Sequence, residues 1–148
     1  QQLWFAGNHS DIGGSYPETE SRLSDIALQW MVEEATKIPY GLKVDGLRAS
    51  GDACDNSRLR LFPASNGLQH CEIAGMRDTL DRLKPKVLAK FLSAKNWAVK
   101  VRDINEDATV HQSVAERFEL LSAPQCSGTG PYRPEALRSH NKFKHYYE

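Results

Sequence analysis

Hydrophobic residues recur at helical spacing in three segments of the chain. Apolar side chains repeat every three or four positions over Ser24–Lys37, which predicts a helix with Ser24 as its N-cap. The same spacing predicts a helix over Lys86–Ala94, after a break at Pro85, and another over Thr109–Leu121. We therefore expect helices to form most of the regular structure.

The segments between these helices contain two candidate strands and two long loops. Large apolar side chains follow one another over Gln2–Ala6, which predicts a short buried strand. Glycine, serine, asparagine and aspartate dominate the next stretch to Pro17, which predicts a long loop. Val44–Gly75 has no sustained period, and we expect a loop-rich region there with one short strand at Arg58–Phe62. Long ordered loops often carry functional residues, so the first loop is the main candidate region.

Composition is typical of an ordinary soluble globular domain. The chain has 148 residues, of which 40% are hydrophobic and 26% are charged. Nineteen Lys and Arg balance 19 Asp and Glu, so no overall charge favours nucleic acid as a partner. No apolar run approaches the ~18–20 residues that a bilayer span needs. We therefore do not expect an integral membrane protein.

The three cysteines stand at unrelated spacings and form no C-x-x-C pair; they are Cys54, Cys71 and Cys126. This pattern predicts neither a disulfide framework nor a thiolate zinc site. We expect free, buried thiols in a reducing compartment, and therefore a cytoplasmic protein.

His9 is the main candidate for chemistry, because it stands in the loop directly after the first predicted strand. In an open parallel sheet, catalytic groups collect beyond the carboxyl ends of the strands. An imidazole with a pKa of about 6.5 can take and return a proton at neutral pH, as the activation of a serine hydroxyl requires. An ordinary hydrogen-bonding role for His9 is the alternative.

The residues after His9 admit a structural and a functional interpretation. The structural one is favoured: Asp11 shapes the loop through an Asx-turn, and Gly13 and Gly14 supply positive φ. In the functional one, Asp11 orients His9 and the glycine amides form an anion-binding nest. Metal binding by His9 and Asp11 with His70 is a third alternative, but a catalytic zinc needs three placed protein ligands. We expect no metal and no cofactor.

A basic segment, Arg82–Arg102, holds seven Lys and Arg residues and no acidic residue. The favoured interpretation is a solvated helix face whose apolar side belongs to the core. The alternative is peripheral contact with an anionic lipid surface through Arg82, Lys86, Lys90 and Phe91.

Towards the C-terminus, His111 stands where a helix would start and is expected to make local or capping hydrogen bonds. The tail Arg138–Glu148 is basic and aromatic, and we favour a frayed terminus over a nucleic-acid contact. No G-x-S-x-G, Walker A, Rossmann or H-E-x-x-H motif occurs. These motifs therefore do not identify the chain, taken alone, as a complete enzyme.

Several blocks of the chain, taken in order, carry a resemblance to known proteins. The most specific block is Leu3–Pro17 continuing into Leu23–Met31, and shorter ones are Leu61–Pro63 with Gly67–His70, His111–Arg117 and Tyr132–Leu137. Together these blocks resemble a family of uncharacterised bacterial and fungal α/β-hydrolase-like proteins, and the same domain type occurs in phospholipase effectors of type VI secretion.

The resemblance implies that residues 1–137 are the C-terminal part of an α/β-hydrolase-like domain, helix- and loop-rich with few strands, followed by the tail 138–148. It implies a serine hydrolase of carboxylic esters, such as a phospholipase or another lipase-like enzyme. His9 is then the triad histidine, because this fold orders its triad Ser, acid, His. The serine and the acid are then expected upstream of Gln1, so this chain alone is expected to be inactive. Two alternatives stay open: a non-catalytic binding or scaffolding piece, and a truncated inactive homologue. For an effector, secretion is the alternative to the cytoplasm.

Overall fold

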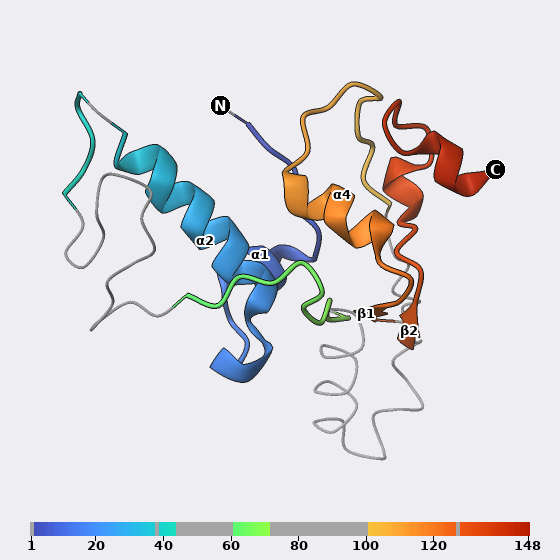
Figure 1. Ribbon diagram of the computed structural model, residues 1–148, viewed down its shortest axis with the longest axis horizontal. Coiled ribbons are helices and arrows are strands. Elements are labelled where there is room, and N and C mark those ends of the chain that lie inside the picture. Colours follow the sequence, from blue (N-terminus) through green and yellow to red (C-terminus); the bar gives the residue numbers. More distant parts are fainter. Residues whose placement is uncertain (1, 38, 44–60, 72–100, 127) are drawn as a thin grey trace, which may run out of the picture. The chain divides into compact units, whose positions relative to one another are not determined.

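The computed structural model describes residues 2–37, 39–43, 61–71, 101–126 and 128–148, and their regular structure is mostly helical (Figure 1). The elements, in chain order, are the helices α1 (His9–Gly13), η1 (Glu18–Glu20), α2 (Arg22–Ala35) and α4 (Gln112–Glu119), the strands β1 (Ala123–Gln125) and β2 (Gly128–Gly130), and the 3-10 helices η3 (Glu135–Leu137) and η4 (Lys144–Tyr147). The chain forms two compact units, Gln1–His70 with Thr109–Tyr132 and Cys71–Ala108 with Arg133–Glu148.

The helix predicted at Ser24–Lys37 is confirmed as α2, although it begins two residues earlier, at Arg22. Ser24 is not the N-cap. Ser21 precedes the helix, and the hydroxyl of Ser24 donates to the Ser21 carbonyl at 2.8 Å. The predicted apolar stripe is buried in its first half and more open in its second, where Met31 is 60% exposed. Helix α1 packs against α2.

The N-terminal segment pairs with the start of α4 at one position. Trp4 and Val110 form an isolated parallel bridge, in which the Trp4 amide donates to Thr109 O at 3.0 Å and the His111 amide donates to Trp4 O at 2.8 Å. The strand expected over Gln2–Ala6 is therefore wrong in extent, because the described residues supply a partner for one residue of it.

Helix α4 lies inside the predicted segment 109–121 and contributes buried side chains to the core of the first unit. Val114 and Phe118 are each 1% exposed. The ring of His111 accepts the Ser113 amide at 3.3 Å, which confirms the expected capping role. Helices that begin with such a side-chain acceptor leave one fewer unsatisfied amide at their N-terminus.

Arg117 of α4 is fully buried, with 0% of its surface exposed. Its guanidinium donates to three backbone carbonyls, those of Ser65 (2.6 Å), Gly67 (2.7 Å) and Pro124 (3.1 Å). It also lies over the Tyr132 ring, 4.8 Å from the centroid. One side chain thus joins α4 to the turn at residues 64–67 and to β1, the first strand of an antiparallel pair with β2.

In the second unit the C-terminal residues are packed, so the expectation of a frayed terminus is wrong. Phe143 is 1% and His140 is 6% exposed. The ring of His140 donates to Ala108 O at 2.9 Å, and the Asn141 amide donates to Glu106 O at 3.0 Å. Phe143 and His140 therefore form the buried part of the tail.

The free thiols expected from the cysteine spacing are also corrected, because Cys71 and Cys126 are both disulfide-bonded. Spacing along the sequence does not reveal which residues the fold brings together. Cys54 lies outside the described residues.

Two further predictions fall on parts of the chain that the structure does not describe. They are the helix over Lys86–Ala94 with the lipid-facing residues Arg82, Lys86, Lys90 and Phe91, and most of the strand at Arg58–Phe62. Within the described ranges, no helix combines the length and the apolar character needed to cross a membrane.

Candidate functional site

The segment predicted as a long loop contains a helix, α1, whose start is fixed by a reciprocal pair of hydrogen bonds. The Asn8 side chain accepts the Asp11 amide at 2.8 Å, and the Asp11 carboxylate accepts the Asn8 amide at 3.0 Å. This is a capping box, and the spacing Asn8-x-x-Asp11 could have predicted it. The loop prediction is therefore wrong at its centre.

His9 is the first residue of α1 and is exposed. It lies immediately after the cap residue Asn8, so the backbone that carries its ring is set by the capping box. A histidine that transfers protons to a bound substrate must be reachable from solvent, and this position meets that requirement.

Only some of the glycines near His9 are needed for their backbone conformation. Gly7 has φ +122°, and a Cβ there would lie 2.5 Å from the Asp11 Cβ, so the cap requires glycine at this position. Gly14 has φ +75° and ends α1. Gly13 is a helical residue without positive φ, so the expectation of positive φ is met by Gly14 and is wrong for Gly13.

Asp11 is buried, and its carboxylate binds His70 as well as Asn8. Oδ1 lies 2.7 Å from His70 Nδ1, and Oδ2 accepts the His70 amide at 3.1 Å. The side chain of Asp11 is 1% exposed and that of His70 is 14% exposed. Asp11 therefore joins α1 to a residue 59 positions away along the chain.

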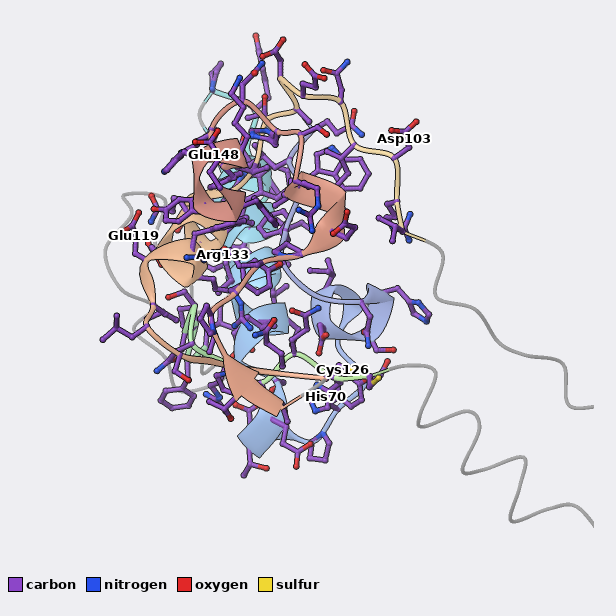
Figure 2. All side chains as sticks on the ribbon, turned by 90° about the vertical axis from the view of Figure 1, so that its right-hand side faces the viewer. His70, Asp103, Glu119, Cys126, Arg133 and Glu148 are labelled. Carbon is purple, nitrogen blue, oxygen red and sulfur yellow. The ribbon has the colours of Figure 1, made fainter. Side chains whose placement is uncertain are left out.

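The ring of His70, which is labelled in Figure 2, makes further contacts through its second nitrogen and through its face. Its Nε2 lies 3.1 Å from Glu20 Oε2, and the Tyr16 ring stacks on it with centroids 3.5 Å apart. Burial lowers the pKa of His70, but the hydrogen bonds to Asp11 and Glu20 outweigh this and raise the pKa above its ordinary value. We call Asn8, Asp11, Tyr16, Glu20 and His70 the His70 cluster.

Sequence reasoning connected Asp11 with His70 only as metal ligands. In the part of the chain that the structure describes, no three His, Cys, Asp or Glu side chains are placed to hold a metal ion. Both ring nitrogens of His70 face carboxylates instead. Tyr16 and Glu20 were missed, because a contact across 50 residues leaves no local pattern.

Two comparisons with known proteins found a match, and the family match lies in the N-terminal part of the chain. Residues 1–34 match the model of the catalytic domain of Tle1-like phospholipase effectors of type VI secretion (T6SS). An uncharacterised protein of Saccharomyces cerevisiae, YEL023C, is 46% identical over 45 residues. That match covers 28% of this chain and 6% of the yeast protein, so the chain spans a small fraction of this relative. No solved structure matches. The segment that carries His9, Asp11 and the first part of α2 is therefore similar to part of a phospholipase catalytic domain.

Proposed function

We propose that this chain carries the histidine-bearing part of the site of a lipase-like ester hydrolase. His9 is the general base that takes the proton of a serine hydroxyl and returns it to the leaving alkoxide. The serine and the acid that orients His9 belong to residues beyond the printed sequence, within an α/β-hydrolase-like fold. The substrate is a carboxylic ester, with a phospholipid as the first candidate.

The observation that carries this proposal is the match of residues 1–34 to a phospholipase catalytic domain, with His9 exposed inside that range. A ring that lies at the surface of this part of the chain is accessible to a serine on another segment. His9 also stands at a capped helix start, so its backbone is already held in one conformation.

The bonds of Asp11 support a positioning role for it rather than the role of the triad acid. Its two oxygens receive the Asn8 amide, the His70 amide and the His70 ring. A triad acid must face the ring of the catalytic histidine. Asp11 instead supports the backbone on which His9 stands.

The test compares two histidine variants of the full-length protein that contains this chain. His9→Ala is expected to lower kcat for a short-chain p-nitrophenyl ester by about 1,000-fold or more, while the circular dichroism spectrum stays that of the wild type. His145→Ala, which changes another exposed histidine, is the matched control and is expected to keep wild-type turnover. Unchanged turnover in His9→Ala would remove His9 from the mechanism.

A second measurement addresses the non-catalytic alternative. A serine-reactive phosphonate is expected to label the full-length protein at one serine and to leave the isolated 148-residue chain unlabelled. Failure to label the full-length protein would favour a binding or scaffolding role.

A further inference from the structure

The His70 cluster places a histidine between two carboxylates directly beside the residue that precedes His9. His70 touches α1 through Asp11 and η1 through Glu20. Its carbonyl also accepts the Asn8 side-chain amide at 3.2 Å. Segments that are far apart in the sequence therefore meet at one imidazole.

We propose that His70 is a positioning residue, which fixes the start of α1, and with it the ring of His9, by holding Asp11 on one ring nitrogen and Glu20 on the other. This inference rests on the proposed function for its catalytic consequence. The contacts themselves do not depend on that function.

The contacts converge on Asn8, the residue next to His9. Its backbone amide donates to Asp11, and its side-chain amide donates to Tyr16 Oη at 3.2 Å as well as to the His70 carbonyl. The orientation of Asn8 is thus set by three groups of the cluster. A small rotation at this residue would turn the helix start and move the imidazole that follows it.

The chemistry of the cluster favours the doubly protonated ring. A carboxylate only accepts hydrogen bonds, so binding Asp11 and Glu20 together requires a proton on both nitrogens of His70. In that state the ring has no lone pair with which to accept a proton from a serine. His70 is therefore suited to hold the site in place, and His9 to transfer the proton.

Glu20 is the carboxylate of the cluster that can be replaced without disturbing buried packing. Its side chain is 49% exposed, whereas that of Asp11 is 1% exposed. Replacing Glu20 by Gln removes one negative charge without opening the core. The change is expected to lower the pKa of His70, because Glu20 then no longer contributes a negative charge and Asp11 is the anion that still binds the ring. The Tyr16 ring, which stacks on His70, is uncharged.

The first test measures kinetics in the full-length protein. His70→Ala is expected to lower kcat by about 100-fold, with KM changed by about twofold or less, because a displaced base affects the chemical step rather than substrate binding. His70→Asn places an amide donor where Nδ1 stands and is expected to recover about tenfold. Wild-type kcat in His70→Ala would overturn the proposal, and so would equal losses in the Ala and Asn variants.

The second test uses a property that a merely structural residue would not change. The high-pH limb of the kcat profile is expected to move to lower pH in Glu20→Gln, since His70 then loses its second proton earlier. Glu33→Gln, with the same charge change on an exposed position of α2, is the matched control. Identical profiles for the two variants would contradict the proposal.

The third test separates this inference from the proposed function. In the 148-residue chain, amide hydrogen exchange at Asp11 and Ile12 is expected to be about tenfold faster in His70→Ala than in the wild type. Unchanged exchange would overturn the positioning role even if His9→Ala abolishes activity. Faster exchange together with an active His9→Ala variant would keep the contacts and overturn the proposed function.

Discussion

Two charged side chains organise the first unit, and their surroundings differ. Arg117 is fully buried and binds three backbone carbonyls. His70 is partly exposed and binds two carboxylates. A guanidinium stays charged at every pH at which the protein folds, whereas an imidazole gains and loses its charge near neutrality. The arginine therefore gives a support that is independent of conditions, and the histidine gives one that depends on pH and salt.

The position of each support fits this difference. Arg117 joins α4 to the turn at residues 64–67 and to β1, all of which belong to the core of the unit. His70 joins α1 to η1 at the segment that carries His9. The conditional support, His70, thus lies at the candidate site. The permanent support, Arg117, lies in the core of the first unit.

The largest expected effect tests the permanent support. Arg117→Met should lower the free energy of unfolding by about 3 kcal/mol, because three backbone carbonyls lose their hydrogen-bond donor. This net value already includes the smaller gain from no longer burying a positive charge. Urea denaturation followed by tryptophan fluorescence measures it. Arg138→Met removes an exposed arginine paired with Glu135 and should leave the midpoint where it is. A midpoint shift in Arg138→Met equal to that in Arg117→Met would refute the distinction.

The next effect concerns the backbone beneath His9. Gly7→Ala should cost at least about 2 kcal/mol, since the alanine would have to adopt φ +122° and its Cβ would meet the Asp11 Cβ at 2.5 Å. Gly13→Ala is the matched control. Nothing lies within 4 Å of a Cβ there and the residue is helical, so stability should stay the same or rise by about 0.5 kcal/mol. Equal losses in both variants would mean that the cap does not constrain Gly7.

The helices of the first unit show what can be predicted from the sequence. The helices α2 and α4 follow from residues whose spacing brings one apolar face to the core, and their predicted ends differ from the observed ends by two or three residues. The cap by His111 is local in the same sense. Such features depend on neighbours within about one helical turn, so the pattern contains them.

Contacts between distant residues left no comparable pattern. An arginine within an amphipathic segment predicts exposure, yet Arg117 is buried because three carbonyls from other segments meet it. The pairing of Asp11 with His70 spans 59 residues. His9 was singled out by its position directly after the first predicted strand, and the resemblance to an α/β-hydrolase-like family then suggested its role. The match of residues 1–34 to a phospholipase catalytic domain supports that relation at a coarse level.

The pH dependence of stability tests the conditional support. Because the pKa of His70 is raised in the folded chain, its contribution is fully present below the ordinary histidine pKa and is lost as the pH rises through the folded-state value. The wild type should therefore lose stability relative to His70→Gln as the pH rises from the ordinary histidine pKa of about 6.5 through the raised pKa of folded His70. Parallel stability curves for the two proteins over that range would contradict the ionic account of the cluster.

Salt should produce the smallest effect and the most selective one. The pair of His70 with Glu20 is partly exposed, so its worth is below about 1 kcal/mol and is screened at 1 M NaCl, where the Debye length is about 3 Å. The stability difference between the wild type and Glu20→Gln should consequently shrink towards zero from 0.05 M to about 1 M salt. The difference between the wild type and Arg117→Met should persist, because buried bonds to carbonyls are screened much less. If salt reduced both stability differences equally, the contribution of Arg117 would come from exposed charges rather than from the carbonyls around it.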